Sequence, residues 1–208
     1  MRFRTLFIAS VVAVVSGLLA AHAQVPGVNS TLQSIFTLAY EVSTSKPTYS
    51  ASYIVTPSGA MNDICVLTGS ATKTIRVRRI WLNGYTATAM TDPVSVVKRS
   101  SVSTNGTGVT VTPVSYNSQN AAGTAVAEFY TASPTNGTAV GVLLDVYQGF
   151  TTSTSGTEEP NHTFEFGRLG SPVFLRGASQ SIAVNLSGLT YTGASFACGF
   201  EWTEDNDS

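Results

Sequence analysis

The fold is decided by the stretch Thr74-Ile75-Arg76-Val77-Arg78-Arg79-Ile80-Trp81-Leu82, which predicts a β-strand whose buried face changes sides. Ile75 and Val77 alternate with arginines, whereas Ile80 and Leu82 fall on the opposite parity. Successive side chains of a strand point to opposite faces, so one regular strand cannot bury both pairs together. We therefore expect either a β-bulge near the Arg-Arg pair or a strand that bends between two sheets, and both belong to a two-sheet architecture.

Short β-rich runs continue on both sides of this stretch. Most are punctuated by Gly, Asn, Pro or Ser, and none shows a sustained helical period. Strands of this length and spacing predict an all-β fold, a two-sheet antiparallel β-sandwich of the jelly-roll type with an N-terminal arm. The predicted strands are 52–56, 64–68, 74–82, 94–99, 109–114, 125–130, 140–147, 163–166, 173–175, 182–186 and 195–202.

Three Asn-Gly pairs, at 83–84, 105–106 and 136–137, indicate turns between these strands. Asn-Gly suits the positive φ angles that type I′ hairpin turns require. The tetrapeptides at 104–107 and 135–138 are both Thr-Asn-Gly-Thr. We interpret them as two similar turns, because the sequence around them does not repeat.

The N-terminus has the three parts of a cleavable signal peptide. Arg2 and Arg4 form a positive region, residues 6–20 are an apolar run, and Ala21-His22-Ala23 is a cleavage box. The apolar run is about 15 residues, short of the roughly 20 that a membrane-spanning helix needs, so an uncleaved anchor is the weaker alternative. We expect cleavage after Ala23, a secreted or extracytoplasmic protein, and no membrane span in the mature chain.

The remaining chain divides into an arm, a domain and a tail. Residues 24–49 mix apolar and polar side chains, with 31–40 as a short helix candidate. This arm either packs on a neighbouring subunit or leads into its own domain, and the sequence leaves both open. Residues 50–204 form the predicted sandwich, and 205–208 an acidic tail.

Composition argues against a nucleic-acid binder. Cleavage removes Arg2 and Arg4, which leaves nine basic residues against twelve acidic ones. Charged residues make up only 11% of the chain, while Ser and Thr supply roughly a quarter. This composition is common in exported β proteins and in particle or fibre proteins.

The two cysteines, Cys65 and Cys198, predict one disulfide. An exported chain meets an oxidising environment, and each cysteine lies in a strand-like run. The bridge would join an early core strand to the last strand. Two buried free thiols are the alternative, because cysteine also packs well as a small apolar residue.

No catalytic, cofactor or metal site is apparent in the sequence. His162 is the single histidine of the mature chain, and there is no Gly-x-Ser-x-Gly motif or phosphate-binding loop. Carboxylates in the predicted strands, such as Glu165 and Glu201, more often pair with arginine across a sheet than act as a glycosidase pair. We therefore expect a protein that is not an enzyme and needs no cofactor.

The residues most suited to face a ligand are Trp81 and the basic cluster of Arg76, Arg78 and Arg79. A tryptophan on a β-sandwich surface can stack on sugar rings. Arginines can dock an acidic surface or pair with carboxylates across the sheet. These residues support an alternative function, a secreted carbohydrate-binding module or adhesin.

Several ordered blocks resemble small virion-associated proteins of tailed phages and prophages, of the head or tail decoration kind. They are residues 67–77, 97–100, 130–135, 175–177, 182–186 and 200–204, so the resemblance covers nearly all of the mature domain. It implies a structural or decoration role on a particle, virion-associated if the chain is phage-encoded, and no catalytic residues. The signal peptide and the cysteine pair depart from that pattern.

Taken together, the sequence predicts a non-enzymatic, exported structural protein that acts in assembly or surface attachment. Its expected partner is itself, as a homo-oligomer, or the surface of a particle or cell, with glycans as the alternative ligand. Loops at the ends of a stiff sandwich would carry the specificity.

Overall fold

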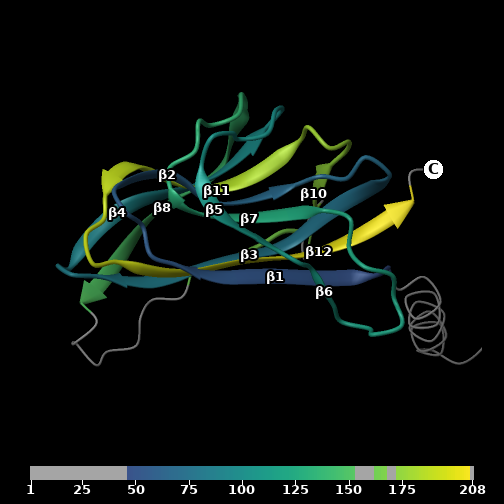
Figure 1. Cartoon of the computed structure of the whole chain (residues 1–208), viewed down its shortest axis with the longest axis horizontal. Coiled ribbons are helices and arrows are strands. Elements are labelled where there is room, and N and C mark those ends of the chain that lie inside the picture. Colours follow the sequence, from purple (N-terminus) through teal and green to yellow (C-terminus); the bar gives the residue numbers. More distant parts are fainter. Residues whose placement is uncertain (1–45, 153–161, 168–171, 207–208) are drawn as a thin grey trace, which may run out of the picture. The chain divides into compact units, whose positions relative to one another are not determined.

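A computed structural model describes residues 46–152, 162–167 and 172–206, and this part of the chain is all-β without a helix (Figure 1). Each of the eleven predicted strands is present, and the short β6 is an addition. The strands are β1 (Thr48–Val55), β2 (Ala60–Thr68), β3 (Lys73–Thr86), β4 (Met90–Arg99), β5 (Thr107–Val111), β6 (Val114–Ser115), β7 (Val126–Ala132), β8 (Ala139–Thr152), β9 (His162–Glu165), β10 (Val173–Leu175), β11 (Ser181–Thr190) and β12 (Ser195–Asn206).

The strands form one curled sheet in the order β5-β7-β2-β11-β4-β8-β3-β12-β1-β6, with β9 and β10 also paired to β3. Strand β8 joins the two halves. It is antiparallel to β4 as far as Phe150, and its last two residues, Thr151 and Thr152, then pair in parallel with Tyr85 and Thr86 of β3. The purely antiparallel sheet that we expected is therefore wrong, because β8 is long enough to leave β4 and run beside β3.

The bulge expected in the deciding stretch is confirmed on β3. Arg79 pairs with Glu201 of β12, but the next pair along the ladder is Val77 with Trp202, so Arg78 has no opposite residue. A bulge shifts the alternation of side chains by one position. The apolar residues on both sides of the bulge accordingly face the core, and all four are fully buried: Ile75, Val77, Ile80 and Leu82.

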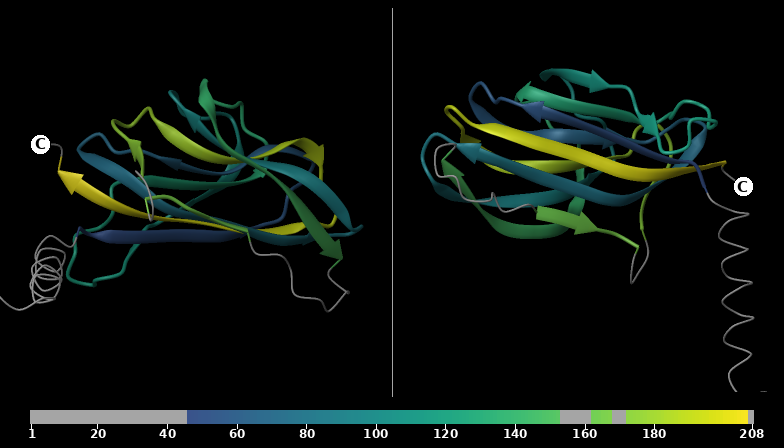
Figure 2. Two further views of the ribbon diagram at one scale, coloured as in Figure 1. Left: turned by 180° about the vertical axis from the view of Figure 1, so that it is seen from behind. Right: turned by 90° about the horizontal axis from the view of Figure 1, so that it is seen from below.

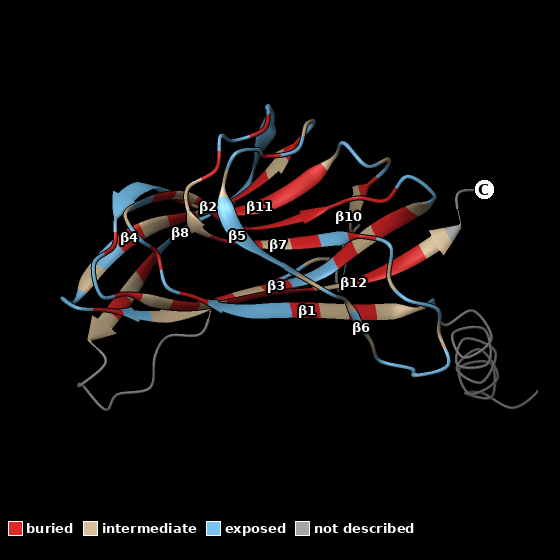
Figure 3. Ribbon diagram, viewed as in Figure 1, coloured by how far each residue is buried: buried red, intermediate tan, exposed pale blue. Residues whose placement is uncertain are grey.

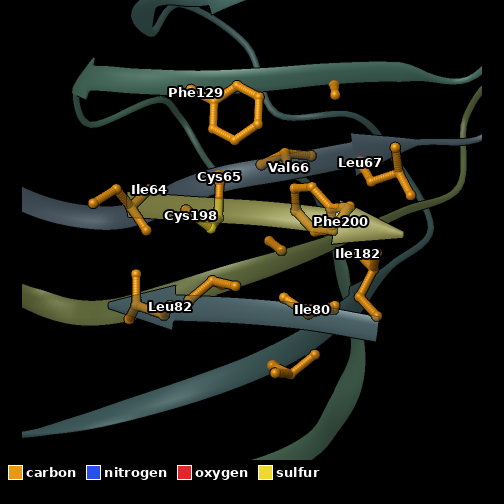
Figure 4. Packing of buried hydrophobic residues seen from close by; sticks show 14 of the residues in the cluster. Ile64, Cys65, Val66, Leu67, Ile80, Leu82, Phe129, Ile182, Cys198 and Phe200 are labelled. Atoms are coloured by element: carbon orange, nitrogen blue, oxygen red, sulfur yellow. A yellow bond between two sulfur atoms is a disulfide. The ribbon is translucent and has the colours of Figure 1, made fainter. Parts of the chain in front are cut away.

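The core lies between the half of the sheet around β12 and the half around β2. Buried residues run along the facing strands of both halves (Figure 3). The predicted disulfide between Cys65 of β2 and Cys198 of β12 is confirmed, with their Cα atoms 6.5 Å apart. Figure 4 shows this bridge among buried apolar side chains, including Phe129 and Phe200. The disulfide thus links the two halves through the centre of the core.

The predicted Asn-Gly hairpin turns are wrong. Asn83-Gly84 lies inside β3, where a side chain at 84 would collide with the backbone of β12, and of the six residues only Asn105 has a positive φ, 60°. The two Thr-Asn-Gly-Thr segments instead meet each other. Thr104 N donates to Thr135 O at 2.9 Å, and Thr135 N donates to Thr104 O at 2.7 Å.

The described domain is longer at both ends than the sequence predicted. Strand β1 begins at Thr48, within the expected arm, and β12 continues to Asn206, so Asp205 is a strand residue and not part of a tail. Asp205 forms ion pairs with Lys46, at 2.7 Å, and with Arg76. Strand β12 runs between β1 and β3 (Figure 2). The predicted signal peptide, most of the predicted arm and residues 207–208 of the predicted tail lie outside the described residues.

Candidate functional site

Ile80 and Leu82 of β3 face the core. Arg79 and Trp81 alternate with them along the strand and therefore face outward. Register places Thr163 of β9 on one side of Trp81 and Gly199 of β12 on the other. The row continues to Ser52 of β1, which pairs with Gly199. The outer face therefore carries one large aromatic side chain in a row of small residues.

The indole of Trp81 lies directly over Gly199. A Cβ atom built at Gly199 would overlap indole atoms Cζ2 and Cε2, and it would also crowd Ser52, at 2.8 Å from that side chain's Cβ. Only glycine leaves the backbone of β12 open to the ring. The absence of a side chain at 199 thus sets the position of Trp81 on the sheet.

A row of charged and polar side chains lies beside Trp81. The guanidinium of Arg79 stands between two carboxylates, with Nη2 3.4 Å from Glu165 Oε1 and Nη1 3.6 Å from Glu201 Oε2. Tyr116 Oη donates a hydrogen bond to Glu201 Oε2 at 2.9 Å. Burial, together with this hydrogen bond to a carboxylate, raises the pKa of Tyr116 above its ordinary value. The row offers both hydrogen-bond donors and acceptors.

Two open cavities, of about 450 and 460 Å³, meet at Trp81, which lines both. We call them together the Trp81 groove. Its lining residues are Ser52, Tyr53, Ile54, Arg79, Trp81, Tyr116, Thr163, Glu165, Ala197 and Glu201.

The members of the predicted basic cluster have different partners, although Arg76 and Arg78 line one cavity together. Arg78 is exposed next to Arg79, where both line a cavity with Glu165, because the bulge turns two consecutive side chains outward. Arg76 instead pairs with Asp205 and lies over the ring of Phe174, 4.9 Å from its centroid. The ion pairs of Arg76 and Arg79 match the expectation of cross-strand pairing for these residues.

A second candidate surface follows β8, where five large apolar side chains are exposed. We call Val140, Val142, Leu143, Leu144 and Tyr147 the β8 apolar surface. Val140 is 64% exposed, Val142 53% and Tyr147 76%. Scattered exposed apolar residues are normal, but a contiguous run of this kind marks an interaction site or an aggregation hazard.

Register shows how this surface arises. Leu144 pairs with Val96 and therefore lies on the face of the sheet that Val96 buries in the core. Leu143 and Val140 have no opposite residue on β4, since β8 bulges at each of them. Of the described strands, only β4 pairs with β8 before Thr151. Tyr147 pairs with Pro93, three residues along β8 from Leu144, so it lies on the opposite face. The exposed apolar side chains thus occupy both faces of a part of β8 that only β4 flanks among the described strands.

Sequence reasoning identified Trp81, Arg78 and Arg79 but missed several residues that build these surfaces. Gly199 carried a signal, because a glycine inside a strand often marks a close approach. Glu201 was expected to pair with arginine, but its contact with Tyr116, 85 residues away in the sequence, has no local signal. The five apolar residues of β8 were assigned to a strand, but their exposure depends on which strands flank it.

No other chemistry is evident in the part of the chain that the structure describes. There, no three His, Cys, Asp or Glu side chains gather to hold a metal ion, and no helix is long and apolar enough to cross a membrane. His162 begins β9, and its ring stacks on that of Phe164, with centroids 6.3 Å apart. No protein-family model matches the chain, and none of the curated proteins matches it.

Proposed function

We propose that the mature chain is a non-enzymatic, exported structural protein that assembles into homo-oligomers through the β8 apolar surface. The observation that carries this proposal is the run of exposed apolar side chains on the part of β8 before Thr151, which pairs with β4 alone among the described strands. An uncovered edge of this kind favours association, and natural proteins cover or blunt it when it has no partner.

A second copy of the chain fits this surface better than a charged partner. Asp145 is the only ionisable group between Ala139 and Val146, and Ser95 Oγ donates a hydrogen bond to it. Each copy therefore brings a single charge to the interface, which limits like-charge repulsion between copies. The bulges at Val140 and Leu143 disfavour a continuous ladder between copies, so we expect side chains to pack across the interface.

The disulfide supports the exported part of the proposal. Disulfides persist in oxidising compartments, so the Cys65–Cys198 bridge is consistent with an extracellular location. We also propose the finer assignment of the fold as a two-layer sandwich of the jelly-roll type, and the bridge across the core supports its two facing layers. A particle or cell surface is then the setting in which such oligomers would act, as in the virion-associated proteins that the sequence resembles.

The test is the oligomeric state of the mature protein, measured by sedimentation velocity and light scattering over a range of concentrations. The wild type is expected to form trimers or larger oligomers. Val140→Lys and Val142→Lys should shift the population toward monomer, because a buried unpaired charge opposes association. The matched control is Val114→Lys on β6, since Val114 is 67% exposed but lies outside the β8 apolar surface. A wild type that stays monomeric at the highest concentrations contradicts the proposal, as does an oligomer that both β8 variants leave intact.

A further inference from the structure

We propose that the Trp81 groove binds a neutral oligosaccharide, with the indole of Trp81 as the stacking platform. The proposal is independent of the β8 apolar surface, which lies on other strands. It rests on three properties of the groove: its aromatic floor, its mixed hydrogen-bonding rim and its balance of charge.

The floor suits the flat apolar face of a sugar ring. Trp81 is only partly buried, although it lies in the middle of a β-sheet face. Its indole packs directly against the backbone at Gly199. Its paired neighbour on β9, Thr163, and the next residue of the row on β1, Ser52, are small. Tyr53 and Ile54 of β1 line the same groove beyond this row and add apolar surface. A rigid aromatic surface of this kind contributes binding energy without ordering a flexible side chain.

The rim suits hydroxyl groups, which both donate and accept hydrogen bonds. Arg79 supplies donors, and Glu165 and Glu201 supply acceptors. The two carboxylates are held by Arg79, and Glu201 is held by Tyr116 as well, so these groups are already oriented. An apolar peptide side chain in the groove would desolvate this row without giving it new partners, which is costly.

The charge of the groove selects a neutral chain. Arg79 meets the carboxylates of Glu165 and Glu201 in the groove, and Arg78 adds a second positive charge in the adjoining cavity, so the side chains around this end have no excess charge. A polyanion such as a nucleic acid or an acidic polysaccharide would meet two carboxylates at the rim. The two cavities lie on either side of Trp81 and are open, so we expect the groove to hold internal residues of a chain as well as its end.

Intrinsic fluorescence gives a direct assay, because the protein has two tryptophans and Trp202 is fully buried. The mature protein is titrated with cellohexaose, chitohexaose, laminarihexaose and xylohexaose, and with hexagalacturonate as the acidic comparison. We expect at least one neutral hexaose to shift the emission of Trp81 in a saturable way. Isothermal titration calorimetry then gives the dissociation constant.

Three variants separate stacking from a structural effect. Trp81→Ala should raise the dissociation constant by about tenfold or more, and Trp81→Tyr should restore part of the affinity. Tyr147→Ala, which removes a more exposed aromatic ring from the β8 apolar surface, should leave it unchanged. Thermal unfolding of each variant shows whether it is folded.

Other outcomes overturn the proposal. It fails if none of the neutral hexaoses binds the folded wild type, if Trp81→Ala binds as well as the wild type, or if hexagalacturonate binds most tightly. Because the monomeric variants of β8 retain the groove, they should bind the same hexaose. Failure of the oligomerisation test would leave this result untouched, so the two proposals fail separately.

Discussion

Arg99 and Asp63 form a two-point ion pair inside the protein, with Nε 2.8 Å from Oδ2 and Nη2 2.7 Å from Oδ1. Both side chains are buried, and the carboxylate also accepts hydrogen bonds from Ser103 Oγ, at 3.1 Å, and Asn185 Nδ2, at 2.8 Å. Arg99 Nη1 donates in turn to Gly137 O at 2.8 Å. One buried pair thus fixes β2, β4, β11 and both Thr-Asn-Gly-Thr segments to each other.

Replacing Asp63 by Ala should lower the free energy of unfolding by about 3–5 kcal/mol, because it leaves the Arg99 guanidinium buried without its counter-charge. Urea unfolding followed by circular dichroism measures the effect. The control is Arg79→Met, which removes an exposed pair and should cost under about 1 kcal/mol. Equal losses in the two variants would mean that burial does not decide the strength of these pairs.

Breaking the disulfide should destabilise the domain by about 4–5 kcal/mol, since the bridge closes a loop between residues separated by 133 positions. We expect this loss in the double variant Cys65→Ala, Cys198→Ala, with the two halves of the sheet still able to pack. Thermal unfolding with and without reductant measures it. A wild type that gives the same transition under both conditions, with free thiols detected only after unfolding, would show that the reductant did not reach the bridge. In that case the double variant alone decides the outcome.

Glu204 should be more important for stability than a carboxylate near a chain end usually is. Its buried carboxylate accepts hydrogen bonds from the backbone N–H groups of Thr124 and Ala125, and from Trp202 Nε1 at 3.0 Å. Glu204→Ala leaves these donors without partners, and we expect a loss of about 3 kcal/mol or more. Emission from Trp202 should shift to the red in the same variant. An unchanged unfolding midpoint would argue against this role for Glu204.

Gly199→Ala tests how the Trp81 groove is built. The new methyl group would overlap the indole, so the ring must move off β12, at a cost of about 1–3 kcal/mol. We expect the emission of Trp81 to change and any binding of hexaose to weaken. Gly59→Ala is the matched control, because a side chain at Gly59 meets nothing within 4 Å. Crystal structures of both variants would show whether the ring has moved.

Alkaline pH should weaken the fold through two buried tyrosines. Burial, together with the nearby carboxylate of Glu128, raises the pKa of Tyr130 above its ordinary value of 10, and burial chiefly does the same for Tyr191. A raised pKa means that the neutral phenol is favoured in the folded protein. Its contribution to stability is therefore complete below about pH 10 and is lost as the pH rises further.

Urea unfolding at neutral pH and between about pH 10 and pH 11 measures this loss. Tyr130→Phe removes one of the groups, along with its 3.0 Å hydrogen bond to Glu128, and should flatten the pH dependence. Stability that stays constant across this range would contradict the assignment.

The strands were predictable because their signals are local. Alternating apolar and polar residues, bounded by Gly, Asn, Pro or Ser, predicted the strands. The apolar residues change from odd to even positions between Val77 and Ile80, and this change predicted the bulge. The Asn-Gly pairs predicted turns wrongly for a physical reason. A glycine allows positive φ angles in turns, but its missing side chain also lets two strands approach closely, as at Gly84. The sequence does not distinguish these two roles.

The contacts that define the surfaces were not predictable, because they depend on which strands become neighbours. The position of Trp81 in a groove depends on Gly199, and the exposure of Val142 depends on β3 pairing with β8 only at Thr151 and Thr152. Glu204 was expected to be the last residue of the domain, before an acidic tail, and nothing in the sequence indicated that the loop before β7 closes over it. The parallel contact of β8 with β3 likewise arises only from the length of β8.

The pairing of Thr48 with Thr203 has a mechanical consequence for a protein anchored at a surface. Tension between the two ends of the domain would open the β1–β12 ladder one hydrogen bond at a time from this pair. Opening would pass along β1 as far as the pair of Tyr53 with Cys198, where the bridge takes the load, because the covalent path then runs from Cys65 directly to Cys198. Residues 66–197, which include the β8 apolar surface and most of the core, would carry none of the load while the bridge is oxidised.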